Sequence, residues 1–306
     1  MMVHPSVFGC ADPLRREQGF SDTYDRAEPI PRSSHQERIQ LPSFIPGVKS
    51  GLNLEMCNHM PLWAISLGDI VGVNGDLLVE SVDEIKRRCR LPQEARLALI
   101  CTAKDAQLNA LWKVSYKKNI WRRIAEMGFE WVTSLSFSVW DEYPRTDQIL
   151  SQDKNFLTHD YFANLGLPSI PFVYPFDDWD YRAFGEWIEE RPDIDKLAVL
   201  AQFYSTDAHF VQFRRNMRKI QEHARRSIKF LVVSAAKRSK VASVMSEFDA
   251  TIVNWKPFHK ALAGNVCDDS LEYEFDPAPR EELAFISFER HLRYCDLLHA
   301  LRQRAA

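Results

Sequence analysis

Residues 131–145 read WVTSLSFSVWDEYPR, and residues 166–180 read GLPSIPFVYPFDDWD. In each stretch a short apolar strand runs directly into carboxylates, aromatic side chains and proline. This layout is expected where parallel strands end in a functional loop, because the carboxyl ends of such strands carry the chemistry of barrel enzymes. The two stretches therefore predict a parallel sheet and also the edge of that sheet at which a site lies.

The same succession of strand and helix continues along the chain on both sides of these stretches. Apolar strands are predicted at 62–67, 96–101, 131–137, 169–174, 197–204, 228–234 and 250–254. Helices are predicted at 115–127, 157–166, 180–190, 208–226, 238–248 and 257–262. A further helix follows Ser81, which forms a capping-box pattern with Glu84 three residues later. Strands that are apolar throughout, each followed by a helix, indicate a parallel sheet buried on both faces.

Closure of the sheet distinguishes an open fold from a barrel. An open doubly wound sheet normally has a glycine-rich phosphate-binding turn after its first strand, and residues 68–75, GDIVGVNG, do not match that pattern. Seven or eight consecutive units favour an α/β fold of the (β/α)8 TIM-barrel type. The eighth strand is not evident, since residues 281–303 have apolar side chains at helical spacing and predict one long C-terminal helix. An incomplete or irregularly closed barrel, or one closed by an N-terminal strand, fits equally well.

Length and composition indicate one principal domain. The chain has 306 residues, is 45% hydrophobic and 26% charged, and carries a net charge of −3, values that are typical of a soluble globular protein. Residues 1–45 contain prolines and charges in no period and predict a flexible arm before a single α/β barrel domain at 46–306. The sequence contains no run of about 18 apolar residues and no signal-peptide pattern, so we expect a cytoplasmic protein without a membrane partner.

The six cysteines are scattered, without a C-x-x-C pair or zinc-ligand spacing, which indicates reduced thiols that mostly pack in the core. Cys101 falls at a predicted strand end, where a nucleophile could lie, although small apolar strand positions often take cysteine. The histidines include no H-E-x-x-H pattern, so no metal site is predicted. The sequence identifies no cofactor.

The residues that follow the predicted strands are unusually polar, and in a barrel they would share one rim. A carboxylate pair from neighbouring strands can act as nucleophile and general acid or base, which gives these predicted catalytic residues: Asp141, Glu142, Asp177, Asp178 and Tyr204. Other polar and aromatic side chains of the rim are candidates for substrate binding: Ser138, Trp140, Tyr143, Tyr174, Gln202, Asn254 and Trp255. The loops after the last two predicted strands precede helices and predict a phosphate site: Ser234, Lys237, Arg238 and Lys256.

Each candidate also has a purely structural interpretation. Asp177 and Asp178 precede a predicted helix, where acidic side chains cap the helix and complement its dipole. Lys237 and Arg238 can form a solvated helix start, and the rim aromatics can cover the barrel core instead of stacking on a planar ring. Aromatic side chains interleaved with carboxylates at one rim favour the functional interpretation.

Four segments carry a resemblance to a protein family: LALICTAKD at 97–105, GFEWVTSLSFSVWDEYPR at 128–145, GLPSIPFVYPFDDWD at 166–180 and LAVLAQFY at 197–204. They resemble an uncharacterised family of bacterial and mobile-element proteins. Its pattern is a strand leading into Phe-Ser-hydrophobic-aromatic, followed by a helix and by Gly-x-Pro-x-Ile-Pro before the next strand. The resemblance implies no activity, and it marks these family positions: Phe137, Ser138, Asp141, Pro144, Pro168 and Pro171.

More remotely, the arrangement is similar to barrels of the tRNA-guanine and DNA transglycosylase type, which use strand-end aspartates on a nucleobase. Those barrels usually carry a Cys/His zinc cluster near the C-terminus. Here Cys267 and Cys295 have no such partners at the right spacing, so a relative of this kind would lack that metal.

Three function classes follow from these features. The first is an enzyme that acts on a nucleotide, a nucleobase or a nucleic acid through the strand-end carboxylates. The second is a non-catalytic nucleic-acid-binding or phage-defence component with a basic stripe on residues 213–226, FRRNMRKIQEHARR. The third is a carbohydrate-active barrel, which requires two carboxylates about 5 Å or about 6.5–9.5 Å apart. The expected partner is therefore a phosphorylated small molecule or a nucleic acid.

Overall fold

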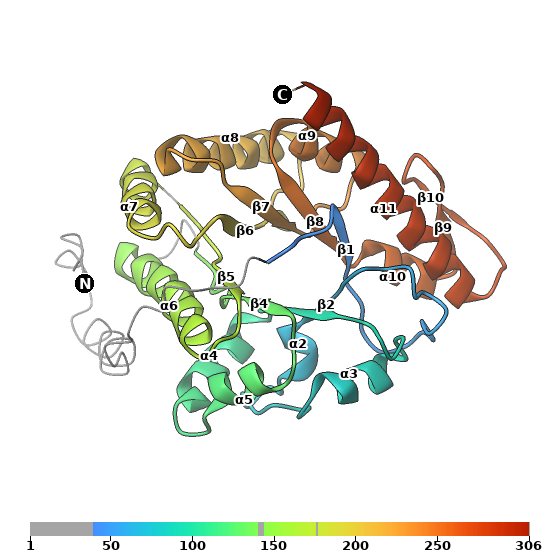
Figure 1. The fold of residues 1–306 in the computed structure, drawn as a ribbon, viewed down its shortest axis with the longest axis horizontal. Helices are drawn as coiled ribbons and strands as arrows, with labels where there is room; N and C mark the ends of the chain where they lie inside the picture. The colour runs from blue at the N-terminus through green and yellow to red at the C-terminus, as the bar shows by residue number, and fades with distance from the viewer. Residues whose placement is uncertain (1–38, 140–143, 176, 306) are drawn as a thin grey trace.

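The computed structural model describes residues 39–139, 144–175 and 177–305. These residues form a mixed α/β fold in which the strands lie in the middle and the helices surround them (Figure 1). One four-stranded sheet has the order β1-β8-β7-β6, formed by Phe44–Pro46, Ala250–Asn254, Lys229–Val233 and Lys196–Leu200. The other has the order β2-β3-β4-β5, formed by Trp63–Ser66, Leu97–Ile100, Trp131–Thr133 and Ser169–Ile170. Every strand pair within these two sheets is parallel, which confirms the predicted parallel arrangement.

Backbone contacts join the two sheets at both of their edges. At one edge an isolated parallel bridge pairs Gly47, which follows β1, with Ala64 of β2. At the other edge Phe172, which follows β5, pairs with Ala198 of β6, and the Val173 amide donates a 3.1 Å hydrogen bond to the Ala198 carbonyl. The edge strands of one sheet therefore meet the edge strands of the other.

The helices connect successive strands and lie outside the sheets (Figure 1). Those before the last strand are α2 (Leu67–Ile70), α3 (Val82–Cys89), α4 (Asp105–Ser115), α5 (Ile120–Glu126), α6 (Arg145–Asn164), α7 (Asp178–Glu189), α8 (Asp207–Ala224) and α9 (Arg238–Glu247). After β8 come α10 (Lys256–Leu262), an antiparallel hairpin of β9 (Asn265–Cys267) and β10 (Tyr273–Phe275), and α11 (Arg280–Ala305). The C-terminal helix α11 packs against α9 and α10.

Local sequence explains where several helices begin and end. Ser81 caps α3 by accepting a 3.2 Å hydrogen bond from the Glu84 amide, as the capping-box pattern predicts. Thr206 caps α8 in the same way, through the His209 amide at 3.2 Å. Gly166 follows α6 with a φ of 78°, a left-handed conformation in which glycine costs less than other residues.

The strands bury both of their faces, which explains why they are apolar throughout. In β6, Ala198 and Leu200 belong to a cluster made of side chains from the strands of both sheets. Leu197 and Val199 point the other way, into a cluster with the apolar side chains of α7, α8 and α9. This alternation has the period of two that strand geometry imposes, so each strand separates an inner core from an outer one.

The first strand differs from the prediction. The predicted strand at 62–67 is β2, and β1 begins earlier, at Phe44, so the predicted boundary at residue 45 falls inside a strand. By pairing with β8, β1 brings the number of strands in the two parallel sheets to eight. Residues 280–305 form one helix, α11, as predicted for the C-terminal segment.

Helices α4 and α6 also differ from the prediction. The predicted helix at 115–127 corresponds to α5, and a separate helix, α4, lies before it. In α4 the buried residues Leu108, Leu111 and Trp112 have helical spacing and face the outer core. Helix α6 begins at Arg145 and not at 157, because Thr146, Gln148, Ile149 and Leu150 are buried along its first turns.

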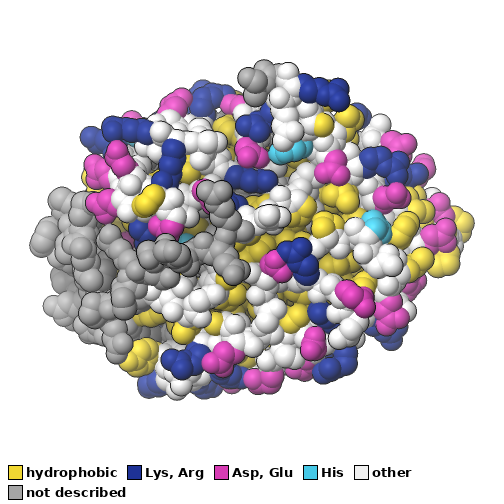
Figure 2. Space-filling model, in the orientation of Figure 1, with side chains coloured by type: hydrophobic (Ala, Val, Ile, Leu, Met, Phe, Trp, Pro, Cys, Tyr) yellow, Lys and Arg dark blue, Asp and Glu magenta, His cyan; other side chains and the backbone are white. Residues whose placement is uncertain are grey.

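Acidic and basic side chains are interspersed over the face of the molecule drawn in Figure 2. None of the helices in the described part of the chain is long and apolar enough to cross a membrane. Residues 1–38, the main part of the predicted arm, lie outside the described residues.

Candidate functional site

A cavity of about 680 Å³ lies at the carboxyl ends of β2 to β6, and we refer to it as the central cavity. Its lining comes from the last residues of these strands and from the loops that follow them. The described lining residues are Ser66, Thr102, Ala103, Lys104, Asp105, Ser136, Ser138, Val139, Tyr174, Leu200, Gln202, Phe203 and Tyr204. This is the edge of the parallel sheets at which the sequence predicts a site.

A second cavity, of about 790 Å³, adjoins the first at the carboxyl ends of β1, β7 and β8. The two cavities share four lining residues, Ser66, Thr102, Leu200 and Gln202. Its other described lining residues are Lys49, Asp69, Ser234, Ala236, Asn254, Trp255, Lys256, His259, Lys260 and Ala263. Because three of these are lysines, we refer to it as the basic cavity.

A third cavity, of about 410 Å³, lies between α7 and α8 on the other side of the central cavity. It shares Val139, Tyr174, Leu200 and Tyr204 with the central cavity. The central cavity therefore adjoins both of the others, and Leu200 at the end of β6 lines all three.

Asp105 supplies the carboxylate among the described lining residues of the central cavity. Its Oδ1 accepts a 2.9 Å hydrogen bond from the Ser138 hydroxyl, which fixes the orientation of the carboxylate. The Tyr174 hydroxyl lies nearby, 2.5 Å from the Ser136 hydroxyl oxygen. Burial raises the pKa of Tyr174, the hydrogen bond with Ser136 partly opposes this shift, and the neighbouring Tyr204 and Asp105 add to it, so this phenol stays protonated and can donate a hydrogen bond.

Asp105 also has a structural role, because it is the first residue of α4 and complements the helix dipole there. That role requires only a carboxylate near the helix start. It does not require the contact with Ser138 or the position on the cavity wall. Both of these features are consistent with a carboxylate that faces a ligand.

The pKa values of three groups in the basic cavity, Lys256, His259 and Asp69, are shifted toward the neutral forms. Burial lowers the pKa of Lys256, and burial followed by the charge of Lys49 lowers the pKa of His259, so this histidine is neutral near pH 7. The Asp69 side chain is exposed, yet desolvation by the surrounding protein raises the pKa of its carboxyl group. The positive charge of Lys49 opposes this shift. An anion that entered this cavity would stabilise the charged forms of the lysines.

Asn254 organises the wall of the basic cavity at the end of β8. Its side-chain amide donates a 3.1 Å hydrogen bond to the Ala235 carbonyl, and its Oδ1 accepts one of 2.9 Å from the Lys256 amide. The Lys256 ammonium in turn donates to the Ala236 carbonyl over 3.2 Å. The loop after β7 and the start of α10 are therefore held together by side chains that line the cavity.

Trp255 forms part of the same wall and packs directly on the backbone of Gly47. A Cβ atom at Gly47 would lie 2.2 Å from the Trp255 indole, a distance at which the ring would have to move. Gly47 thus allows the indole to approach the bridge that joins β1 to β2.

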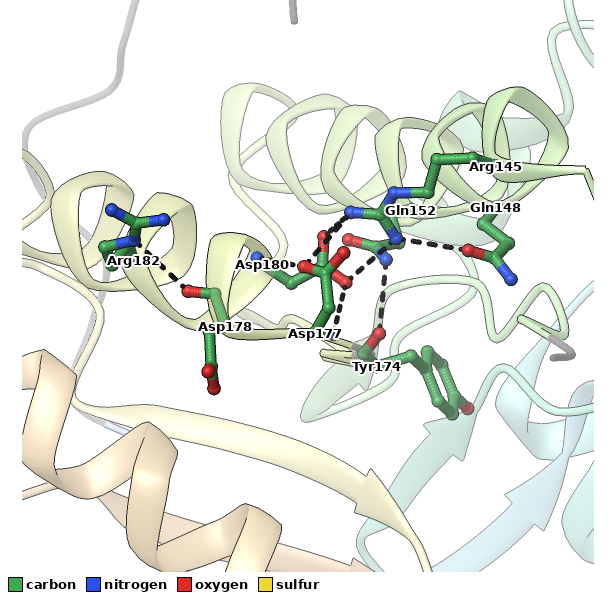
Figure 3. A network of polar contacts seen from close by, with 8 residues as sticks. All are labelled: Arg145, Gln148, Gln152, Tyr174, Asp177, Asp178, Asp180 and Arg182. Atoms are coloured by element: carbon green, nitrogen blue, oxygen red, sulfur yellow. Dashed lines mark hydrogen bonds and ion pairs between the residues drawn. The ribbon is translucent and has the colours of Figure 1, made fainter. Parts of the chain in front are cut away.

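The predicted carboxylates Asp177 and Asp178 lie away from the central cavity and line the third one. Asp177 is the N-cap of α7, where it accepts a 2.9 Å hydrogen bond from the Asp180 amide and lies 3.5 Å from Arg145. Asp178 forms a 2.7 Å salt bridge with Lys219, and its carboxylate points away from Arg145 (Figure 3). These contacts favour the structural interpretation of both residues, and a catalytic role for them stays a prediction.

A buried ion pair that has no counterpart among the predicted site residues lies beside them. Asp180 is 1% exposed and accepts two hydrogen bonds from the Arg145 guanidinium, one of them at 3.1 Å. Arg145 also donates to Gln148 at 3.1 Å, and Gln152 donates to the Tyr174 carbonyl at 3.2 Å (Figure 3). This network ties the start of α6 to the start of α7 and to the loop after β5.

The predicted phosphate-binding residues separate into two groups. Ser234 and Lys256 line the basic cavity. Lys237 and Arg238 are exposed and do not belong to its described lining. The Arg238 guanidinium instead lies 5.4 Å from the ring centre of Tyr294 and donates a 3.3 Å hydrogen bond to its hydroxyl. The alternative of a solvated helix start fits this second pair.

The predicted substrate-binding residues that the structure describes line the central cavity or the basic cavity. The central cavity is lined by Ser138, Tyr174, Gln202 and Tyr204. The basic cavity is lined by Gln202, Asn254 and Trp255. The remaining predicted residues lie outside the described residues, namely Trp140, Asp141, Glu142 and Tyr143.

Three charged residues of the described lining of the basic cavity are absent from the predicted site. Lys49 follows β1, a strand that the sequence pattern does not reveal. Asp69 lies on the one-turn helix α2, directly after β2. Lys260 has a detectable signal, because it lies four residues after Lys256 on the same helix and therefore on the same face.

Cys101 is fully buried in the outer core cluster, and burial raises the pKa of its thiol, so it is placed as a packing residue and not as a nucleophile.

In the described ranges, His, Cys, Asp and Glu side chains form no group of three or more that could hold a metal ion. No protein-family model matches the sequence, and no curated protein matches it at significant similarity.

Proposed function

We propose that this chain is an enzyme that acts on a nucleotide, or on another ring-containing compound that carries phosphate, bound across the central and basic cavities. The proposal includes a closed barrel of the (β/α)8 type. The bridges between Gly47 and Ala64 and between Phe172 and Ala198 support closure, because they lie at the two places where an open sheet would have free edges. Closure would place the carboxyl ends of all eight strands on one rim.

One observation carries the proposal: two cavities of different chemistry share a wall. The described lining of the central cavity has two tyrosines, one carboxylate and one lysine, and that of the basic cavity has three lysines and one carboxylate. Gln202, Ser66 and Thr102 line both, so a single ligand can have its ring in one cavity and its phosphate in the other. Sites for small molecules typically combine apolar walls with a few polar groups that fix orientation.

Asp105 is the carboxylate placed to take part in a reaction at the ring. Because Ser138 donates a hydrogen bond to it, Asp105 acts as an acceptor, which suits a general base. The Tyr174 hydroxyl, kept protonated by burial, can donate a hydrogen bond to a group on the same ligand. We therefore expect a reaction assisted by proton transfer to Asp105.

The alternative of a non-catalytic nucleic-acid-binding protein requires a free basic stripe on α8. Most basic side chains of the predicted stripe instead form salt bridges with neighbouring acids, namely Arg214 and Arg218 with Glu247, Lys219 with Asp178, and Arg225 with Glu189. Acidic and basic groups are also interspersed over the face in Figure 2. Paired charges release fewer counterions from a polyanion than free ones, which favours the enzyme over this alternative.

Isothermal titration calorimetry with purine and pyrimidine nucleoside 5′-monophosphates tests the proposal. We expect at least one of them to bind the full chain, and Lys256→Met to weaken that binding about 10- to 100-fold, the loss expected for one charge-assisted hydrogen bond. The control is Lys113→Met, which removes an exposed lysine of α4 that lines neither cavity. Equal losses in the two variants, or no binding to the unaltered chain, would contradict the proposed site.

A further inference from the structure

The charges that line the basic cavity are unequal. Lys49, Lys256 and Lys260 bring three ammonium groups, and Asp69 is the one carboxylate of the described lining. None of the three lysines forms a salt bridge within the part of the chain that the structure describes. His259 is neutral near pH 7, because burial and Lys49 lower its pKa. Two positive charges of the lining are therefore unmatched.

Tyr273, the first residue of β10, explains how two of these ammonium groups are held side by side. Its ring centre lies 4.6 Å from the Lys256 ammonium and 5.8 Å from that of Lys260. Its hydroxyl lies 2.8 Å from Nε2 of His291, a buried residue of α11 that stacks on Phe44 with ring centres 5.2 Å apart. An aromatic face attracts ammonium groups, so the tyrosine gathers both lysines at one end of the cavity.

The partner of this tyrosine adds no charge of its own. Burial, with Lys256 nearby, lowers the pKa of His291 to about 3, so the imidazole is neutral at physiological pH. Glu272 and Lys237 lie outside the lining and act on the pKa of Lys256 in opposite directions. The excess of positive charge at the α10 end of the cavity therefore comes from Lys256 and Lys260, the two lysines that Tyr273 faces.

From this arrangement we infer that the α10 end of the basic cavity takes a terminal phosphate, a phosphomonoester dianion, and that Tyr273 is the positioning residue for the two lysines that bind it. The inference rests on the proposed function and narrows its substrate class. A phosphomonoester carries two negative charges above its second pKa near 6, whereas a phosphodiester carries one. Two unmatched positive charges are balanced by the monoester and not by an internal phosphate of a nucleic-acid strand.

The first part of the test compares ligands on the unaltered full chain. Calorimetry is carried out with a nucleoside 5′-monophosphate, its 5′-methyl phosphodiester and the nucleoside. At a pH of about 8 we expect the monoester to bind at least about tenfold more tightly than the diester. At a pH of about 5 the ratio of the two affinities should fall toward one, because the monoester then carries a single charge while the charge of the diester does not change.

The second part compares variants of the positioning residue and of one lysine. Tyr273→Leu removes the aromatic face and should weaken monoester binding about five- to thirtyfold. Tyr273→Phe keeps that face, loses the hydroxyl contacts with His291 and with the Cys267 thiol, and should stay within about threefold of the unaltered chain. Lys260→Met, a change on a partly exposed helix face that leaves folding intact, should bring the monoester-to-diester ratio toward one.

The outcomes separate this inference from the proposed function. If the unaltered chain binds monoester and diester equally, the terminal-phosphate assignment is wrong, although the proposed site stands. If Tyr273→Leu is folded by circular dichroism and binds the monoester as tightly as the unaltered chain, the positioning role is wrong. If the unaltered chain binds none of these compounds, the proposed function fails and this inference fails with it.

Discussion

Replacing Arg145 by methionine is expected to lower the free energy of unfolding by about 3 kcal/mol, measured by chemical denaturation. The substitution leaves the Asp180 carboxylate buried at 1% exposure without the guanidinium that donates two hydrogen bonds to it. Loss of one partner of a buried pair typically costs about 3–5 kcal/mol. We take the lower end because the Arg145 side chain is 25% exposed, so solvent can partly replace it.

The matched control for this prediction is Arg182→Met on α7. Arg182 is largely exposed and its Nε donates only a 3.4 Å hydrogen bond to the Asp178 carbonyl, so its loss should change stability by less than about 0.5 kcal/mol. A change below about 1 kcal/mol for Arg145→Met would show that the pair with Asp180 is not the link between α6 and α7 described above.

Replacing Asp105 by asparagine is expected to lower the turnover of a nucleotide substrate about 10²- to 10⁴-fold, the contribution of a positioned general base. Asparagine has nearly the same shape, and it keeps an oxygen that can accept the hydrogen bond from Ser138. Substrate affinity should therefore change little, and the loss should lie in the rate. Product formation from the nucleotides that bind is measured by liquid chromatography and mass spectrometry.

Asp177→Asn provides the comparison for this variant. Asparagine caps helices as well as aspartate does, so α7 should keep its N-terminus and turnover should stay within about threefold. The opposite pattern, a large loss with Asp177→Asn and none with Asp105→Asn, would return the catalytic role to the carboxylate that the sequence pattern favours. The roles of Asp141 and Glu142 stay predictions, and the same assay can be applied to them.

The strands could be predicted from the sequence because burial on both faces requires continuous apolar segments, and such segments stand out. β1 is the exception. It has three residues, Phe44–Pro46, and ends in proline, so its identity as a strand depends on its pairing with β8, some 200 residues away. A pairing over that distance leaves no local signal. Lys49 could not be predicted as a site residue for the same reason, since a residue can be assigned to a strand end only when the strand is known.

The candidate site could be predicted in part for a related reason. Tyr174, Gln202 and Asn254 lie at or near the carboxyl ends of predicted strands, so their place at the cavities follows from topology. A carboxylate between a strand and a helix is ambiguous, because capping and catalysis both place an acid there. Only three-dimensional contacts separate Asp177, which caps α7 beside Arg145, from Asp105, which faces the central cavity.

A crystal structure of the full chain with a bound nucleoside 5′-monophosphate would show whether the ligand spans the central and basic cavities. We expect the phosphate to lie beside the ammonium groups of Lys256 and Lys260, and the base to lie in the central cavity near Tyr174 and Asp105. Ligand density in the third cavity or on the outer helices would contradict it. The absence of ligand from both the central and the basic cavity, at a ligand concentration that saturates binding in solution, would contradict it as well.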